Sequence, residues 1–294
     1  MIRFAVIGTN TITDKFLQAA STLPDFKLCA VYSRTLARAQ EYAQKNNVSL
    51  VFDSLEALAD SDQIDAVYIA SPNFCHAAQS ILMMQHHKHV LCEKSFTIDA
   101  KQAKEIFALA QEKHVFVMEA FWTKFIPLYR QIEEILESGK LGEIRAVTAQ
   151  YGYTTARETR KFDPALAGGT LLDIGVYAIG FACMMMGYAF DDVRSELVMN
   201  SAGTDALDAI TLRKGKTIAQ LTTAIGVNMP TFAAVYGTKG HIDIPEFREI
   251  PTYKRMCICI LKNDHACKYM GFSPTKEEMS KRSQIMEQYR IIVS

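Results

Sequence analysis

The 294-residue sequence lacks an excess of charge of either sign. Its 32 Lys and Arg residues balance its 32 Asp and Glu residues, so the formal net charge is zero. A protein that binds nucleic acid normally carries a basic surface that neutralises phosphates, and no basic run occurs in this sequence. The charge balance therefore argues against a nucleic-acid partner.

The seven cysteines lack the spacing of a metal site or of a disulfide framework. No CxxC motif and no Cys/His spacing typical of zinc occurs, so we expect no metal site. Free thiols fit a reducing compartment. The N-terminal run MIRFAVIG is too short for the apolar core of a signal peptide, and we find no apolar run as long as a membrane span. We therefore expect a soluble, cytoplasmic protein without a membrane partner.

The first 120 residues alternate short apolar runs with longer helical patterns. Predicted strands are residues 2–7, 27–32, 49–52, 66–70, 89–92 and 115–118, with helices such as 36–45, 76–86 and 100–113 between them. Strands separated by helices of this length predict right-handed βαβ units and a doubly wound parallel sheet. This part of the chain is therefore predicted to be an α/β domain over residues 1–120.

The pattern changes after residue 120. Predicted helices cover 127–138 and 170–186, and predicted strands cover 143–153, 194–200, 206–212, 217–225, 231–236 and 241–244. Strands that follow one another without helices predict an open, mainly antiparallel or mixed sheet. We therefore predict a second, α+β domain over residues 121–294.

The turn after the first predicted strand occupies the position of a dinucleotide-binding turn. It reads Gly8-Thr9-Asn10-Thr11-Ile12 and opens a helix. Gly8 allows a tight turn, and the helix N-terminus offers unpaired N–H groups to a pyrophosphate. Asn10 and Thr13 stand where G-x-G-x-x-G has its later glycines; Asn tolerates a left-handed backbone, and Thr is small. Position favours nucleotide binding, and a plain strand-to-helix turn is the alternative.

Two further strand ends bear on the cofactor. Ser33 and Arg34 follow the second strand, where proteins that bind NAD usually carry an acid. Both can contact a 2′-phosphate, which favours NADP over NAD, although Arg34 could simply be an exposed residue of the helix's first turn. Ser71, Pro72 and Asn73 follow the fourth strand and should border the cofactor. Asn73 or His76 would cap the next helix, and capping alone would explain Asn73.

Two groups of residues are candidates for the reacting site. Glu93 and Lys94 end the fifth strand, where the simple interpretation is a solvated turn; a partly desolvated lysine beside a cofactor could instead share a proton or polarise a carbonyl. Asp173 and Tyr177 are spaced i, i+4 in an otherwise apolar helical pattern, so they share one face. A buried Asp needs a partner. An Asp at a helix entry, with a Tyr that only packs, is the alternative.

The chain resembles the Gfo/Idh/MocA oxidoreductases, the family of glucose–fructose oxidoreductase and inositol dehydrogenase. The resemblance rests on AVIGTNTIT, DAVYIASPNFCHAAQS, HVLCEKSF, EAFWTKFIP, GGTLLDIGVYAIG and YGTKGHIDIP, which follow in the family's order and spacing over residues 1–247. The Asp-x-Gly-x-Tyr ending is similar to the dimeric dihydrodiol dehydrogenase and xylose dehydrogenase branch. It implies an NAD(P)-binding Rossmann domain followed by a domain for substrate binding and oligomerisation.

The resemblance also implies an activity, namely hydride transfer between a nicotinamide and a secondary alcohol or carbonyl of a sugar, polyol or trans-diol. Lys94 would contact the nicotinamide and the reacting hydroxyl, Asp173 would polarise the site, and Tyr177 would exchange the proton. The family's pattern further places Glu93 and Trp122 near the cofactor and Lys124, Arg157 and Phe162 along the substrate cleft. An open sheet of this family commonly pairs two copies, so a homodimer or larger homo-oligomer is expected.

Three departures from the family's pattern motivate a second hypothesis. Asn10 and Thr13 replace glycines, and Ser95 replaces the proline after Lys94, which removes a constraint on the backbone. After residue 245 the chain is short: we predict one strand over 253–261 and a closing helix over 275–289, with edge strands missing or rearranged. The second hypothesis is a catalytically weak regulator or sensor that binds NADP(H) and keeps the fold.

Overall fold

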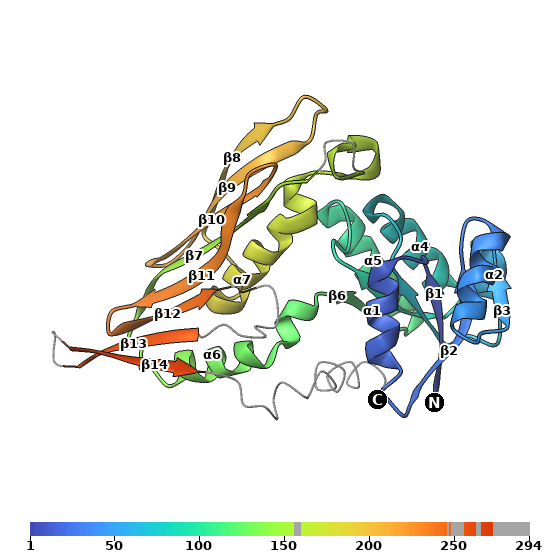
Figure 1. The fold of residues 1–294 in the computed structure, drawn as a ribbon, viewed down its shortest axis with the longest axis horizontal. Helices are drawn as coiled ribbons and strands as arrows, with labels where there is room; N and C mark the ends of the chain where they lie inside the picture. Colours follow the sequence, from blue (N-terminus) through green and yellow to red (C-terminus); the bar gives the residue numbers. More distant parts are fainter. Residues whose placement is uncertain (156–159, 246, 248–255, 263–265, 273–294) are drawn as a thin grey trace. The chain divides into compact units, whose positions relative to one another are not determined.

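A computed structural model describes residues 1–155, 160–245, 247, 256–262 and 266–272. The described residues form two compact units, Met1–Phe121 and the part of the chain from Trp122 onward. Each unit is built around its own sheet, and Figure 1 gives the labels of the helices and strands.

The first unit is a six-stranded sheet in the order β3-β2-β1-β4-β5-β6, and every pair of neighbouring strands is parallel. The strands are β1 (Ile2–Ile7), β2 (Phe26–Tyr32), β3 (Leu50–Phe52), β4 (Ala66–Ile69), β5 (His89–Glu93) and β6 (Val117–Ala120). The helices are α1 (Thr11–Ala20), α2 (Leu36–Lys45), α3 (Leu55–Asp60), α4 (Asn73–Gln85) and α5 (Ala100–Lys113). The predicted doubly wound sheet is confirmed. Strand order reverses between β1 and β4, and ligands of such sheets bind at this switch point, beyond the carboxyl ends of the strands.

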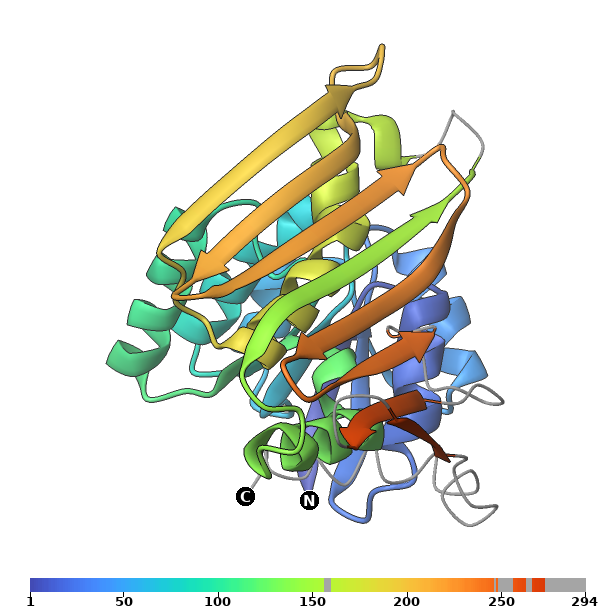
Figure 2. The ribbon, with the colours of Figure 1, turned by 90° about the vertical axis from the view of Figure 1, so that its left-hand side faces the viewer.

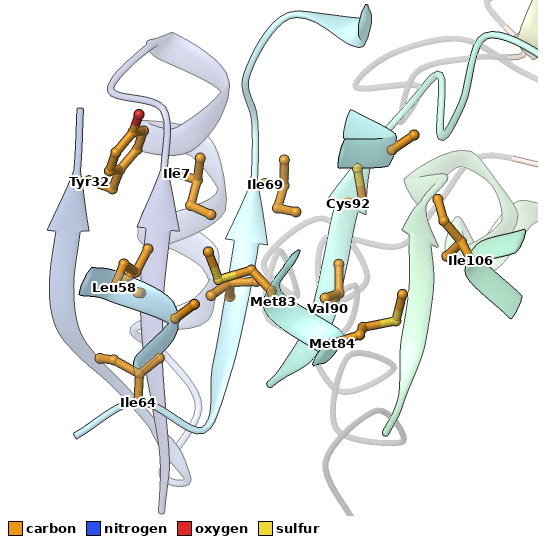
Figure 3. Packing of buried hydrophobic residues seen from close by; sticks show 14 of the residues in the cluster. Ile7, Tyr32, Leu58, Ile64, Ile69, Met83, Met84, Val90, Cys92 and Ile106 are labelled. Atoms are coloured by element: carbon orange, nitrogen blue, oxygen red, sulfur yellow. The ribbon is translucent and has the colours of Figure 1, made fainter. Parts of the chain in front are cut away.

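Alternation along the strands gives the first unit a core on each face of its sheet. In β1, Ala5 and Ile7 belong to one buried cluster and Phe4 and Val6 to the other. Figure 3 shows the first cluster, in which side chains of β1, β4 and β5 meet methionines of α4. Because both faces are covered, the strands read as continuous apolar runs. The polar residues that follow them are therefore confined to the ends of the sheet.

The second unit is an eight-stranded sheet in the order β14-β13-β12-β11-β7-β10-β9-β8. Its strands are β7 (Ile144–Tyr153), β8 (Asp192–Met199), β9 (Asp205–Lys214), β10 (Thr217–Ile225), β11 (Met229–Gly237), β12 (Gly240–Pro245), β13 (Met256–Lys262) and β14 (Ala266–Phe272). Its helical segments are η1 (Trp122–Phe125), α6 (Pro127–Glu137), η2 (Arg160–Phe162), η3 (Pro164–Leu166), the π-helix η4 (Leu171–Gly175) and α7 (Val176–Met186). β7 and β10 are parallel, and the other pairs are antiparallel. The predicted mixed open sheet is confirmed.

Helix α7 covers one face of this sheet, packing on β7 and β10. Figure 2 looks onto the opposite face, with α7 behind the strands. On β10, Ala219, Leu221 and Thr223 are buried, whereas the alternate residues Ile218 and Gln220 are exposed. The described part of the chain therefore covers one face of the second sheet and leaves the other face open.

One segment corrects the expectation that no apolar run reaches the length of a membrane span. Pro164–Met186 meets that criterion by length and composition, with a mean hydropathy of 1.6. Half of its most apolar window is buried inside the structure, as in the core helix of a globular domain. Its apolar character follows from packing in the second unit, where Phe181 and Ala182 are fully buried.

The C-terminal expectation is also corrected. The strand predicted over 253–261 is observed as β13, and it pairs with β14 in a continuous antiparallel register from Met256–Phe272 to Lys262–Ala266. The edge of the sheet is thus present, and the sequence prediction missed β14. The helix predicted over 275–289 lies outside the described residues.

Candidate functional site

The turn after β1 requires a glycine at its first position. Gly8 has a φ of +111°, and a Cβ atom there would lie 2.7 Å from the carbonyl oxygen of Ala70. Any other residue would meet both the steric cost of a positive φ and this backbone contact. Gly8 therefore brings the turn into direct contact with the end of β4, at the switch point of the sheet.

Asn10, which stands in place of the second glycine, acts through its side chain and not through the left-handed backbone that was expected. Its φ is −124°, so the backbone is extended rather than left-handed, and that part of the prediction was wrong. Its side chain is the N-cap of α1: Oδ1 accepts hydrogen bonds from the N–H groups of Ile12 (3.0 Å) and Thr13 (3.2 Å). Its Nδ2 donates to the carbonyl of Ala70 at 2.6 Å. The amide thus ties the start of α1 to the end of β4.

Thr13 keeps α1 close to the sheet, as expected of a small residue. It is fully buried, and its hydroxyl donates to the carbonyl of Gly8 at 2.8 Å. Thr9 is half-buried before the helix, and Thr11 and Ile12 form its first positions. The N-terminal turn of α1 therefore lies at the switch point, where amides and helix dipole favour an anion.

Ser33 and Arg34 lie at the end of β2. Ser33 is buried, and its N–H donates to Phe52 at 3.2 Å. Arg34 is exposed and stands one residue before Thr35, the N-cap of α2, so it is not part of that helix's first turn. Its charge lowers the pKa of the Cys75 thiol, which burial raises more strongly. Arg34 is therefore a cation available at the carboxyl edge, near the start of α4.

The segment after β4 corrects the capping prediction. The N-cap of α4 is Pro72 and has no side-chain hydrogen bond, while Asn73 is the first residue of the helix. The Ser71 hydroxyl donates instead to Gln79 Oε1 at 2.6 Å. Proline pre-sets the backbone angle that a helix start needs. Neither Asn73 nor His76 is thus required as a cap.

His76 is fully buried and joins the segments that follow β4 and β5. Its Nε2 lies 2.9 Å from the carbonyl oxygen of Ser71, and its Nδ1 lies 2.8 Å from that of Ser95. Carbonyl oxygens only accept, so a neutral ring can donate to one of them and an imidazolium to both. The geometry makes His76 a support for the backbone around Lys94.

The end of β5 is not a solvated turn, because Glu93 is only 9% exposed. Tyr68 donates to Glu93 Oε1 at 2.6 Å, and Glu119 of β6 accepts from the Phe96 N–H at 3.0 Å. Burial raises the pKa of both carboxyl groups, and the charge of Lys94 acts against that rise in each case. Lys94 thus lies within the field of two buried acids. The Lys94–Ser95 peptide bond is cis although no proline is present.

In the second unit, Asp173 lies in the π-helix η4, a rare geometry that occurs frequently at functional sites. Its Oδ2 accepts from the Tyr153 hydroxyl at 2.7 Å and lies 3.0 Å from Lys161 Nζ. Lys161 also donates to the Tyr153 hydroxyl, and its ammonium lies 4.5 Å from the centre of that ring. Two donors on one oxygen, one of them charged, favour the ionised form of Asp173. Asp173 therefore has the partners that a part-buried acid needs.

Sequence reasoning missed Tyr153 and Lys161. The only local signal was the aromatic repeat Tyr151-Gly152-Tyr153 at the end of β7, where the two rings are 5.7 Å apart. Tyr177, the first-turn tyrosine of α7, is buried and meets Tyr151 edge to face at 6.4 Å. The second unit therefore brings three tyrosines, an acid and a lysine to the end of β7 and the start of α7.

The remaining predicted residues are less closely grouped. Trp122 is half-buried in η1, Phe162 is half-buried in η2, and Lys124 is exposed with its ammonium 5.9 Å from the ring of Tyr188. Arg157 lies outside the described residues. Within the described ranges, no group of three His, Cys, Asp or Glu side chains could hold a metal ion.

The parallel sheet, its strand order and the glycine turn at its switch point define a dinucleotide-binding protein of the Rossmann class. The chain belongs to the GFO/IDH/MocA family: the oxidoreductase model with an NAD-binding Rossmann fold matches residues 2–121, and the family's C-terminal domain model matches residues 129–243. A domain of unknown function, DUF3440, also matches residues 206–281. The predicted family is confirmed, and the first unit is its NAD(P)-binding domain.

Several relatives are similar over most of the chain. The scyllo-inositol 2-dehydrogenase (NADP(+)) IolU of Bacillus subtilis is 42% identical over 72% of this chain and 66% of its own length. The trans-1,2-dihydrobenzene-1,2-diol dehydrogenase of Xenopus laevis is 34% identical over 85% of this chain and 77% of its own. The solved structure of KijD10, a 3-ketoreductase from Actinomadura kijaniata in complex with NADP and TDP-benzene, superposes with a TM-score of 0.86 at 26% identity, covering 99% of this chain and 89% of that one.

Gly8 and Gly139 provide a matched test of the nucleotide turn. Both have a positive φ, +111° and +65°, but a Cβ atom at Gly139 would meet nothing within 4 Å. We expect Gly139→Ala to cost about 1 kcal/mol from the backbone alone, and Gly8→Ala clearly more because of the contact with Ala70. Thermal unfolding measures the difference. Equal losses in the two variants would contradict the close approach of the turn to β4.

Proposed function

We propose that this oxidoreductase is an NADP-preferring dehydrogenase or reductase that acts on a secondary hydroxyl or carbonyl of a sugar, polyol or trans-diol. The observation that carries the proposal is the Asp173 cluster, because a carboxylate held by Lys161 and Tyr153 one turn before Tyr177 is built for polar chemistry. The names of the similar proteins, an inositol dehydrogenase, a dihydrodiol dehydrogenase and a 3-ketoreductase, support the same substrate class.

The first unit has the features that NADP needs. Gly8 has no side chain, so a pyrophosphate could lie close to the backbone of the turn. The N-terminal turn of α1 offers this anion a favourable dipole, although the N–H groups of Ile12 and Thr13 already donate to Asn10. Ser33 and Arg34 stand where a 2′-phosphate would lie, and Arg34 is exposed and unconstrained by a helix. We propose that the residues bordering the cofactor are Ser71, Pro72, Asn73, Glu93 and Trp122. His76 would hold the segments after β4 and β5 in place through the carbonyls of Ser71 and Ser95. Bound NADP would supply the hydride acceptor or donor.

The proposed chemistry divides among three side chains. Oxidation of an alcohol breaks its C–H and O–H bonds; the hydride would leave to the cofactor, and the hydroxyl proton would pass to Tyr177, which acts as the phenolate and becomes the phenol. Lys94 would hold the reacting oxygen and stabilise the negative charge on that oxygen and on the phenolate. Asp173, kept ionised by Lys161, would accept a hydrogen bond from the substrate and fix its orientation. Reduction runs through the same groups in reverse.

The substrate would be held by residues of the second unit. We propose Lys124, Arg157 and Phe162 for this role, as the family pattern implies. Lys124 is exposed and its ammonium lies near the ring of Tyr188, so both side chains are accessible to a polar ligand. Two of the departures that motivated a regulator have structural roles in this fold, because Asn10 caps α1 and β14 pairs with β13 at the edge of the sheet. The catalytically weak alternative is not favoured.

A cofactor titration tests the nucleotide half of the proposal. We expect NADPH to stabilise the protein against heat at lower concentration than NADH, since Arg34 can pair with the 2′-phosphate. Arg34→Ala should weaken NADPH binding by about 10- to 100-fold and leave NADH unchanged. Arg38→Ala, an exposed arginine one turn along α2, serves as the control. Equal binding of the two cofactors, or an equal loss for both in Arg34→Ala, would refute the preference.

Kinetics test the reacting half. With polyols and cyclic diols as substrates and NADP as oxidant, Lys94→Ala and Tyr177→Phe should each lower kcat by about 10²- to 10⁴-fold. Lys161→Met should lower kcat/KM by about 10- to 100-fold, because Asp173 loses its charged partner. Lys45→Met removes a surface pair with Asp14 and should change nothing. Full turnover in the Lys94 or Tyr177 variants would contradict the proposed roles of these residues. Absence of turnover on any alcohol or ketone would contradict the proposed function.

We also propose a cytoplasmic homodimer, or larger homo-oligomer, formed through the open face of the second sheet. That face presents Ile218 and Tyr236, 44% and 36% exposed, and Cys29, Cys75, Cys92 and Cys183 are free thiols, as in a reducing compartment. Light scattering should give at least twice the chain mass of 32.9 kDa, and Ile218→Glu should lower it. A monomer at all concentrations would exclude the assembly.

A further inference from the structure

Asp208 of β9 is a buried acid for which the proposed chemistry has no use. It is 0% exposed and lies on the covered face of the sheet, in alternation with the buried Ile210 and Leu212. Neither of its carboxyl oxygens accepts a hydrogen bond from a donor among the described residues. An ionised carboxylate in this state would lose its solvation without compensation. The site therefore needs either a proton or a cation.

Among the residues that the structure describes, the groups that act on the Asp208 carboxyl supply no positive charge. On its own strand the charged neighbour is Asp205; across from it in register are Thr223 of β10, whose hydroxyl also lacks a partner, and the apolar Leu197 of β8. From η4 comes Gly175, where a Cβ atom would lie 3.5 Å from the Thr223 hydroxyl. Burial, then the charge of Asp205, raises the pKa of Asp208 to about 7, and Thr223 acts weakly in the opposite direction.

Asp205 holds the start of the π-helix η4. Its Oδ2 accepts from the Leu171 N–H at 2.5 Å, and its backbone carbonyl accepts from the Thr170 hydroxyl at 3.1 Å. A Cβ atom on Gly169 would lie 2.0 Å from Asp205 Oδ1, so only glycine allows this approach. Asp173 follows Leu171 by two residues. The position of the Asp173 carboxylate therefore depends on Asp205.

We propose that Asp205 and Asp208 share one proton, so that the neutral carboxyl of Asp208 donates to Asp205 and the pair positions η4 and with it Asp173. Two carboxylates only accept, and a hydrogen bond between them requires a proton on one. Asp208 is a positioning residue here, since it acts on Asp173 through Asp205. The effect on turnover rests on the proposed function, whereas the shared proton itself can be measured without any substrate.

The pairing fixes the sign of a pH effect on stability. The pKa of an unfolded Asp is about 3.9, well below the pKa of about 7 that Asp208 has in the folded chain. Between about pH 4 and pH 7 the folded chain therefore binds up to one proton more than the unfolded chain. Stability from this group therefore falls as pH rises through that window and is constant above it. Asp208→Asn cannot ionise and keeps an N–H donor, so it should abolish this slope.

Thermal unfolding from pH 5 to pH 8 tests the pair. Relative to Asp208→Asn, the unmodified chain should lose about 5 °C or more in Tm across this range. Asp192→Asn, which removes a surface acid paired with Arg194, should run parallel to the unmodified chain. Parallel curves for the unmodified chain and Asp208→Asn would overturn the shared proton. So would a rise in Tm on adding Na⁺, K⁺ or Ca²⁺ at constant ionic strength that Asp208→Asn abolishes, because the site would then hold a cation.

Two further measurements keep the proposal testable if Asp208→Asn fails to fold or the enzyme shows no turnover. With ¹³C-labelled aspartate, which separates the signal from the buried Glu93 and Glu119, the infrared band of a protonated Asp carboxyl should be present in the unmodified chain at pH 6 and lost as pH rises through 7; its absence at pH 6 would overturn the pair. Where turnover is measurable, kcat should fall above pH 7 and Asp208→Asn should remove that fall with little change in KM. Identical pH profiles would overturn the positioning role while leaving the proposed function intact.

Discussion

Backbone carbonyls left at the ends of β4 and β5 need donors, and the first unit supplies them from two side chains. Asn10 donates to Ala70, and His76 faces the carbonyls of both Ser71 and Ser95. Because these hydrogen bonds are buried or part-buried, an unpaired carbonyl there would be costly, and each pairing fixes a loop. The turn after β1 and the segments after β4 and β5 are thereby tied to one another. The position of Lys94 at the carboxyl edge follows from this arrangement more than from the residues beside it.

The second unit shows how surroundings set the state of an acid. Asp173 receives a phenol and an ammonium on one oxygen, and its charge is compensated. Asp208 lies in the same unit without a donor, and burial favours its neutral form. Asp173 belongs to η4, and Asp205 links the start of η4 to β9, the strand that carries Asp208. With the proposed shared proton, the charged acid within this short π-helix is positioned through Asp205 by a neutral acid of the neighbouring strand.

Much of the fold follows from local patterns in the sequence. Residues 2–7, 36–45, 100–113 and 217–225 were predicted with the bounds that β1, α2, α5 and β10 have, because period and capping signals agree there. The proposed reacting residues were predicted from motif and from position at strand ends. The contacts of His76, and those of Lys161 with Asp173, were not predictable, since they join segments whose approach depends on irregular turns. β14 was missed because its sequence, ACKYMGF, carries little alternation.

The central proposal is that Lys94 and Tyr177 act on one substrate oxygen beside the nicotinamide. A crystal structure with NADP and a bound polyol tests it most directly. The account predicts Lys94 Nζ and Tyr177 Oη each within about 3.5 Å of the same hydroxyl oxygen, with the carbon that bears it facing C4 of the nicotinamide. A complex in which C4 faces away from that carbon, or in which the two side chains contact different parts of the ligand, would contradict it.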